Sequence, residues 1–261
     1  GEVWRPFDIL PPVFVELTEA FYLAGDKSVP VTVRVKANRD NVSGAFQLSA
    51  PRGWPISGPE TTAATLKKKG DVAEYTFQLQ SQGGPNLVDL SAGFKIGDKV
   101  YTSSLQTIKY EHIPQQYVLQ PAQARAARID LNVGAKTVGY YMGAGDDGPA
   151  ALRRMGCTVT LLEAADLTVE KLRRFDAVVL GVRAYNTKDA LKQQQAQLME
   201  YVQQGGTLLA QYNTSYNMVT QDIAPYPLKL GRDRVTDETA EIRFLKPDHP
   251  ALNTPNILTT A

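Results

Sequence analysis

The sequence has one cysteine and two histidines in 261 residues. A single cysteine, Cys157, excludes an intrachain disulfide and a zinc cluster built on cysteines. Cys157 begins a predicted strand at the end of the sheet away from the expected site, which favours a small core residue over a nucleophile. His112 and His249 lie in linker and turn sequences, without the spacing of a metal site or a catalytic triad. We therefore expect no catalytic residue, no metal site and no cofactor in this chain.

An excess of charge and long apolar runs are also missing. The formal net charge is +1, so there is no electrostatic reason to expect a nucleic-acid partner or an anionic membrane. No apolar run approaches the roughly 18 residues of a transmembrane helix. The hydrophobic fraction of 43% is ordinary for a globular protein, and the length is sufficient for two domains.

Residues 1–110 have the pattern of an all-β domain. Apolar and polar residues alternate in short segments, most clearly at Val29–Val35, and turn sequences such as Asn38–Asn41 separate them. We expect an antiparallel, Ig-like sandwich. Trp54 is predicted to fill one end of its core, the alternative being an exposed platform for a sugar. Lys67–Gly70 is predicted to be a solvated turn rather than a ligand site.

Residues 111–135 are predicted to connect two domains, with the boundary near Gln120. Proline and glutamine dominate the first part, as is typical of a linker. The second part, Ala122–Leu131, either pairs as an edge strand or runs over the surface.

From residue 136 to residue 261 strands and helices alternate. The expected strands are residues 138–142, 157–162, 175–182 and 207–211, with helices between them and a long helix at residues 187–204. This order predicts a doubly wound, flavodoxin-like parallel sheet with strand order 2-1-3-4. Residues 241–245 look like one further strand. The last helix and strand of such a domain are not evident, so we expect either a truncated domain or loops in place of these elements.

The turn after the first of these strands has glycines spaced as G-x-G-x-x-G in the segment Gly143–Gly148. Glu163 lies where a ribose-binding acid would be expected. However, the carboxylates of Asp146 and Asp147 would repel a pyrophosphate. Turn formation and helix capping are the favoured interpretation, and a dinucleotide site is a remote alternative. A ligand here is expected to carry hydroxyls or a cation.

Polar residues follow the third and fourth strands of the same predicted sheet. Open α/β sheets place their sites at the carboxyl ends of the strands, where the strand order reverses. The alternative is an ordinary rim of caps and turns. The candidate ligand-binding crevice consists of Asp146, Asp147, Arg183, Tyr185, Asn186 and Asn213.

Several segments resemble the C-terminal region of large bacterial PIG-L/LmbE-type deacetylases, especially those of Bacteroidetes. Those in the second half are GYYMGAGDDGPAALRRMG, FDAVVLGVRAYNTKDALK, GGTLLAQYNTSYN and the run Tyr226–Val235. APRGWPISGP and IKYEHIPQQ resemble the preceding sandwich and its exit. The resemblance spans most of the chain. It implies a NEW3-like β-sandwich followed by a class I glutamine amidotransferase-like domain.

Two departures from this family affect the expected chemistry. The zinc motif Pro-His-Pro-Asp-Asp is absent, because His249-Pro250 continues as Ala251-Leu252. The resemblance therefore implies that zinc binds in an upstream deacetylase domain outside this chain. The nucleophilic cysteine of amidotransferases is also missing, since the turn after the fourth strand reads Tyr212–Ser215. Ser215 has no G-x-S-x-G context.

The resulting functional hypothesis is a non-catalytic accessory region of a PIG-L-type N-acetylglucosaminyl deacetylase. It would bind a glycan or a protein partner, and the resemblance favours a periplasmic or secreted location. One alternative is a divergent hydrolase at the switch point of the sheet, using Asp146 or Asp147 with Arg183 and Tyr185. The other is a scaffold or dimerisation module.

Overall fold

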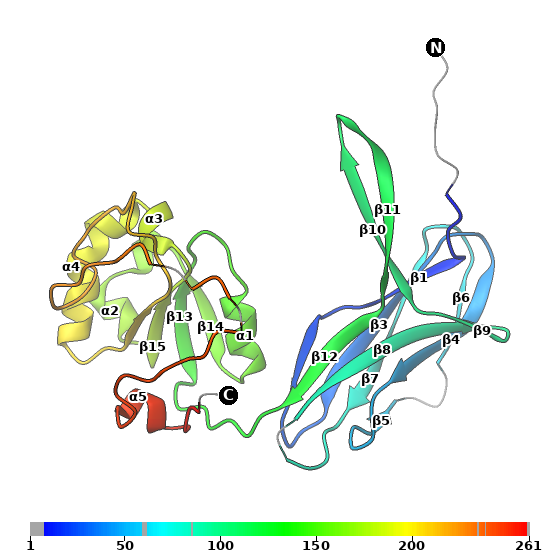
Figure 1. The fold of residues 1–261 in the computed structure, drawn as a ribbon, viewed down its shortest axis with the longest axis horizontal. Coiled ribbons are helices and arrows are strands. Elements are labelled where there is room, and N and C mark those ends of the chain that lie inside the picture. The colour runs from blue at the N-terminus through cyan, green and yellow to red at the C-terminus, as the bar shows by residue number, and fades with distance from the viewer. Residues whose placement is uncertain (1–7, 59–61, 85, 234, 238, 260–261) are drawn as a thin grey trace. The chain divides into compact units, whose positions relative to one another are not determined.

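The computed structural model describes residues 8–58, 62–84, 86–233, 235–237 and 239–259. The chain divides into two compact units, Gly1–Asp130 and Leu131–Ala261. The strands in Figure 1 belong mainly to the first unit, and the longer helices belong to the second.

Two β-sheets form the body of the first unit. One has the order β1 (Val13–Leu17), β3 (Val29–Ala37), β7 (Val72–Leu79), β5 (Ile56–Ser57). The other has the order β2 (Phe21–Ala24), β12 (Gln123–Arg128), β8 (Asn86–Ile96), β4 (Val42–Ser49), β6 (Ala63–Leu66), and β9 (Lys99–Tyr101) also pairs with β8. Neighbouring strands are antiparallel, except that β12 runs parallel to β2.

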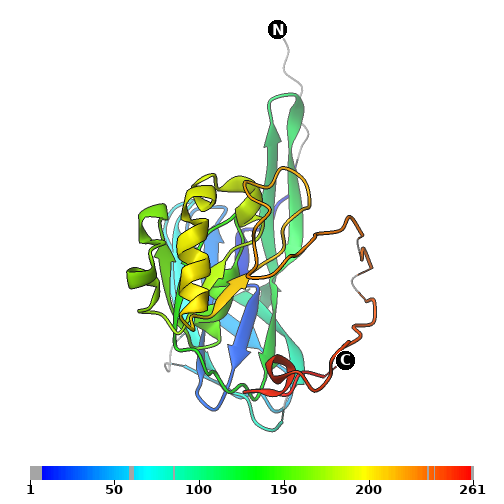
Figure 2. The same cartoon turned by 90° about the vertical axis from the view of Figure 1, so that its left-hand side faces the viewer.

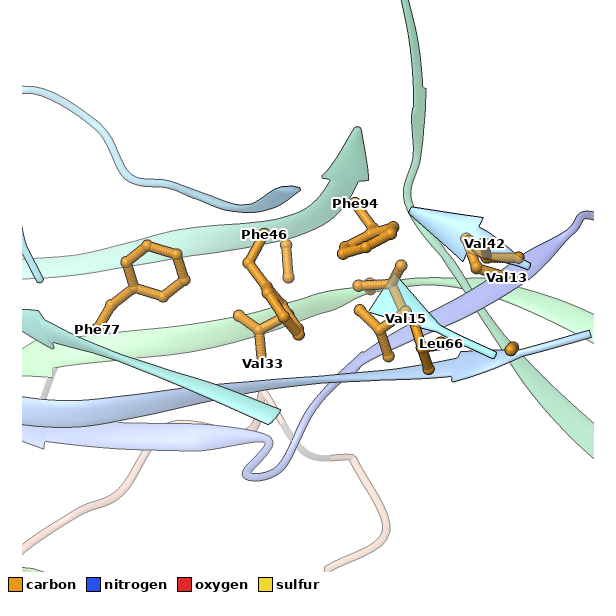
Figure 3. Close-up of a cluster of buried hydrophobic side chains, with 12 residues drawn as sticks. Val13, Val15, Val33, Val42, Phe46, Leu66, Phe77 and Phe94 are labelled. Carbon is orange, nitrogen blue, oxygen red and sulfur yellow. The ribbon is translucent and has the colours of Figure 1, made fainter. Parts of the chain in front are cut away.

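The inward faces of these two sheets make one core. In β3 the side chains of Val31, Val33 and Val35 are buried, while the residues between them face away. Figure 3 shows valines of β1 and β3 meeting Phe46 and Phe94 of the other sheet. Each buried side chain of this size contributes roughly 1.5–3 kcal/mol. The prediction of a β-sandwich is confirmed.

A second cluster closes the sandwich core, and Trp54 is its largest side chain, only 2% exposed. Trp54 therefore fills the core and is not a platform for sugar.

The structure differs from the linker predicted for residues 111–135. β10 (Ser103–Tyr110) and β11 (Ile113–Pro121) form a two-stranded antiparallel ribbon. β12 lies between β2 and β8, so it is not an edge strand or a surface segment. The buried Ala124 and Ala126 alternate with polar residues along β12. This alternation is hard to recognise in the sequence, because alanine is only weakly apolar. The units divide after Asp130 rather than near Gln120.

The second unit contains a parallel sheet with the order β14-β13-β15-β16. The strands are β13 (Thr137–Tyr141), β14 (Thr158–Leu162), β15 (Ala177–Leu180) and β16 (Leu208–Ala210). The helical segments are α1 (Gly148–Arg154), η1 (Ala164–Asp166), α2 (Val169–Leu172), α3 (Ala184–Thr187), α4 (Ala190–Gln203) and α5 (Pro250–Asn253). The predicted strand order 2-1-3-4 is confirmed.

Apolar clusters lie on both faces of this sheet. On one face Val178 and Leu180 pack with Leu172 of α2 and Leu198 of α4. On the other face Val138, Tyr140 and Val159 pack with Leu152 of α1. Cys157 belongs to the second cluster and is buried, which confirms its interpretation as a core residue. Figure 2 shows the long α4 beside the strands.

The strand predicted at Glu241–Leu245 does not form, and these residues have irregular backbone. An alternating pattern makes a strand only where a neighbouring edge accepts its hydrogen bonds, and this segment pairs with no other part of the chain that the structure describes. Within the described ranges, no helix is long and apolar enough to cross a membrane.

Candidate functional site

Asp146 joins two loops at the carboxyl ends of the parallel strands. Its Oδ1 accepts hydrogen bonds from the Tyr140 hydroxyl at 2.5 Å and the Gly148 backbone N–H at 2.9 Å. Its Oδ2 accepts from the Val182 backbone N–H at 3.1 Å. Asp146 thus connects the turn after β13 to the turn after β15.

The Tyr140 hydroxyl extends this network to the fourth strand, because it also accepts from Gln211 Nε2 at 3.1 Å. Burial alone would raise the pKa of Asp146, but the hydrogen bonds from Tyr140, Gly148 and Val182 together hold that pKa below its ordinary value. Burial and the neighbouring Asp146 raise the pKa of Tyr140. Tyr140 therefore stays protonated and donates to an ionised Asp146.

The glycine spacing of Gly143–Gly148 is explained by this packing. A Cβ added at Gly143 would lie 2.0 Å from the carbonyl oxygen of Val182, and one at Gly148 would lie 2.3 Å from the Tyr140 hydroxyl. Gly145 has φ +104°, a conformation that favours glycine. The chain's own contacts thus require glycine here, and no phosphate is needed to account for the motif.

The expected helix cap is only partly formed. Asp147 occupies the N-cap position of α1, but its side chain makes no capping hydrogen bond and is exposed. Asp146 takes over part of that role through Gly148. Pro149 lies in the first turn of the helix, as expected.

The polar residues after β15 and β16 come together, as predicted, but they bind each other. Asn186 Nδ2 donates to the carbonyl oxygens of Thr214 and Tyr216, at 3.1 and 2.9 Å, and its Oδ1 accepts from the Thr214 N–H at 2.9 Å. Asn213 Oδ1 accepts from the Tyr185 N–H at 3.0 Å. These side chains fix the two loops against one another.

Tyr185 is fully buried and does not face a crevice. Its hydroxyl donates to Gln195 Oε1 at 2.9 Å, and Gln195 Nε2 donates to the carbonyl oxygen of Asp222. Burial raises the pKa of Tyr185 to about 12. The sequence alone does not distinguish a core role for Tyr185 from a ligand-binding role, because a tyrosine next to the end of a strand suits both.

Arg183 lies in the sharp turn between β15 and α3. Its backbone is left-handed, with φ +57° and ψ 27°, and its N–H donates to the Tyr212 carbonyl oxygen at 2.6 Å. The Nε atom is buried without a hydrogen-bond partner in the part of the chain that the structure describes. Arg183 thus occupies a strand-to-helix turn that holds a nucleophile in some α/β enzymes.

A cavity of about 480 Å³ opens beside the loop after β16. Tyr212 is 60% exposed and Tyr216 is 48% exposed. The cavity is lined by Tyr212, Asn213, Thr214, Ser215, Tyr216, Gly231, Arg232 and Asp233. Of the predicted crevice residues, only Asn213 lines it. In the sequence, this cavity could have been indicated only by Tyr212 and Tyr216, the two tyrosines on either side of Asn213–Ser215.

The residues that could ligate a metal are scattered in the described ranges. These ranges contain no group of three His, Cys, Asp or Glu residues that could hold a metal ion. His249 Nδ1 accepts a hydrogen bond from the Ala251 N–H at the start of α5.

The sequence matches no protein-family model and no curated protein. The solved structures that match include an Escherichia coli alpha-2-macroglobulin spanning domain MG7 to the C-terminus, with 18% identity and a TM-score of 0.30 over 45% of this chain. Others are a Salmonella alpha-2-macroglobulin mutant, with 15% identity and a TM-score of 0.32 over 49% of this chain, and the apo Calx CBD1 domain, with 8% identity and a TM-score of 0.26 over 47%.

The matched region spans 16% of that Escherichia coli chain and 7% of the Salmonella chain, whereas it covers 100% of the Calx domain. Identities and TM-scores this low carry no conclusion about relationship or function.

Proposed function

We propose that this chain is a non-catalytic accessory region of a PIG-L/LmbE-type deacetylase and that it binds carbohydrate. The zinc-dependent reaction, hydrolysis of an N-acetyl group from a GlcNAc-like sugar, would take place in another domain of the parent protein. The segments Gly139–Gly156 and Gly205–Asn217 carry the family resemblance on which this assignment depends.

Within this proposal the second unit is a flavodoxin-like, amidotransferase-like domain that has lost its chemistry. Its strand order and the apolar clusters on both faces of its sheet support this classification. The turn after β16 contains Asn213 and Thr214, whose polar groups hold loops together instead of attacking a substrate.

The observation that carries carbohydrate binding is the cavity beside β16. Tyr212 and Tyr216 present aromatic rings with a polar end, which suits the alternating C–H and hydroxyl surface of a sugar. Arg232 and Asp233 add a charged donor and a charged acceptor for hydroxyl groups. A mainly uncharged, hydroxyl-rich ligand fits this lining.

The hydrolase alternative would use Asp146 or Asp147 as a general base. Asp146 accepts three hydrogen bonds, which lower its pKa and its basicity. An effective base has a pKa near the working pH, so Asp146 is poorly suited to this role.

The proposal is tested by titrating the chain with N-acetylglucosamine oligomers, using calorimetry or protein NMR. We expect Tyr212→Ala and Tyr216→Ala to weaken binding at least about tenfold, or about 1.4 kcal/mol. Tyr226→Ala is the matched control, because Tyr226 is 65% exposed and does not line this cavity.

Binding that is equally weakened by the control, or no binding of any oligomer on a broad glycan array, would reject the carbohydrate role. Deacetylation of N-acetylglucosamine oligomers by the chain alone would reject the non-catalytic assignment.

A further inference from the structure

The β10–β11 ribbon extends beyond the two sheets of the first unit (Figures 1 and 2). Its outer edges pair with no strand among the described residues. A two-stranded ribbon is marginally stable in water, and a third strand or a packed face is usually needed to hold it. The ribbon therefore has the form of an incomplete sheet.

A cavity of about 570 Å³ lies along one side of this ribbon. Its lining includes Ser104, Leu105 and Thr107 of β10 but no residue of β11. The opposite wall comes from β1, β3 and the turn that ends at Gly70. The cavity thus lies on the β10 side of the ribbon, where the strand edge is unpaired.

The strand register shows which backbone groups point to that edge. The Ala122 N–H donates to the Thr102 carbonyl oxygen at 2.7 Å, which makes this a hydrogen-bonded pair of the antiparallel ladder. Pairs alternate along a ladder, so Leu105↔Leu119 and Thr107↔Tyr117 are non-hydrogen-bonded pairs. The N–H and C=O groups of Leu105 and Thr107 therefore point away from β11, toward the open edge.

The charges that line the cavity do not cancel. Arg34 forms ion pairs with Glu16, at 2.9 Å, and with Glu74, at 2.6 Å, so these three side chains together carry one negative charge. Lys36 and Lys69 also line the cavity, and neither forms an ion pair within the residues that the structure describes. Two ammonium groups are thus left for an incoming anion.

The carboxylates nearest to these lysines in sequence have other partners. Asp71 Oδ2 accepts from the backbone N–H groups of Lys67 and Lys68, at 3.0 and 2.9 Å. Asp40 Oδ1 accepts from the Lys69 N–H at 2.8 Å. Both carboxylates stabilise the predicted turn.

The exposed apolar part of the lining is aliphatic, because its one aromatic side chain, Phe14, is only 9% exposed. Val72 is 53% exposed, and Leu105 is half-buried. Aliphatic side chains of a peptide fit such a surface, whereas sugars stack on exposed aromatic rings.

We propose that an extended acidic peptide segment of a partner protein binds in this cavity as a third strand of the ribbon. Its backbone pairs with Leu105 and Thr107, as in β-strand addition to an open sheet edge. Its acidic side chains pair with Lys36 and Lys69, and its apolar side chains contact Val72 and Leu105. The site uses no residue of the tyrosine cavity, so either can fail alone.

The charge requirement is tested with fluorescein-labelled peptides and anisotropy on the full chain. We expect a decapeptide of alternating glutamate and valine to bind and its lysine–valine counterpart not to bind. The double variant Lys36→Glu with Lys69→Glu should weaken binding at least about tenfold. The matched control is Lys67→Glu with Lys68→Glu, because these adjacent lysines do not line the cavity. Equal losses in both double variants would overturn the proposal.

The strand-pairing requirement is tested by proline substitution at one register pair. Thr107→Pro removes a donor at the cavity edge of the ribbon, whereas Tyr117→Pro removes one at the far edge. We expect only Thr107→Pro to abolish binding, with unchanged circular dichroism in both variants. Peptide binding that survives Thr107→Pro would overturn the proposal, because the peptide would not pair as a strand. An oligogalacturonate that competes fully and binds equally well to Thr107→Pro would also overturn it and would assign the cavity to an acidic glycan.

Discussion

The carboxylate of Asp146 accepts a hydrogen bond from the backbone N–H of Val182 at 3.1 Å, across the carboxyl ends of two parallel strands. A side chain that the sequence suggests for a ligand therefore holds the sheet's own loops. The same carboxylate binds Tyr140 and Gly148. Gly143, Gly148 and Gly181 beside it have no room for a side chain.

Replacing Asp146 with asparagine should destabilise the protein. The asparagine amide is uncharged, and its NH₂ group replaces one of the two acceptor oxygens of Asp146. Either the Tyr140 hydroxyl or the Val182 N–H therefore loses its acceptor. A group left unsatisfied in this way costs about 1–3 kcal/mol. The free energy of unfolding in urea measures this loss. Asp147→Asn is the control, because its exposed side chain makes no capping bond, and it should change stability by less than about 0.5 kcal/mol.

The stability supplied by Asp146 should depend on pH in one direction. Its pKa in the folded state is below the ordinary value of 3.8, so the folded form binds its proton less tightly than the unfolded form. The contribution is present above pH 3.8 and is lost as the pH falls through the lower folded pKa. Unfolding free energies across this range should fall less steeply in Asp146→Asn than in the parent. Parallel curves would contradict this assignment.

Gly143→Ala should be more harmful than an ordinary glycine replacement. The new Cβ would lie 2.0 Å from the Val182 carbonyl oxygen, which is backbone and cannot rotate away. Overpacking of this kind costs about 1–3 kcal/mol or more. Gly25→Ala provides the comparison, since nothing lies within 4 Å of its Cβ. Thermal unfolding of both variants measures the difference, and equal melting temperatures would show that the turn can open without cost.

Tyr185→Phe should destabilise the second unit because it removes the donor to Gln195 Oε1 in a buried site. The expected cost is about 1–3 kcal/mol, and Tyr226→Phe at an exposed position should cost nothing measurable. Tyr185 also has a pKa of about 12, above its ordinary value of 10. Its contribution is therefore complete below pH 10 and is lost as the pH rises toward 12. Near-ultraviolet titration of the parent against Tyr185→Phe should show this late-ionising tyrosine.

The β-sandwich and the parallel sheet could both be predicted because their sequence periods are strong. Valines at every second position of β3 and the apolar run in β15 leave little choice of structure. The ribbon could not be predicted from these signals, because β11 contains glutamine and proline and is exposed on both faces. The same composition is typical of a linker, and only its pairing with β10 distinguishes the two.

The candidate site could be located but not interpreted from the sequence. Residues after β13, β15 and β16 do meet at one edge, as the strand order requires. The sequence does not show whether a polar side chain points outward or back. Asn186 and Tyr185 bind other parts of the chain. Tyr212, which is not among the predicted crevice residues, is exposed.

The place of β12 has a mechanical consequence. The chain leaves the first unit directly after this strand, which is hydrogen-bonded to β2 on one side and β8 on the other. A pull on the chain at Leu131 directed along the axis of β12 would load both rows of hydrogen bonds in shear. Bonds that share a load break together, whereas those of an edge strand peeled from one end break one at a time. Tension between the two units would therefore be resisted where the chain leaves the sandwich.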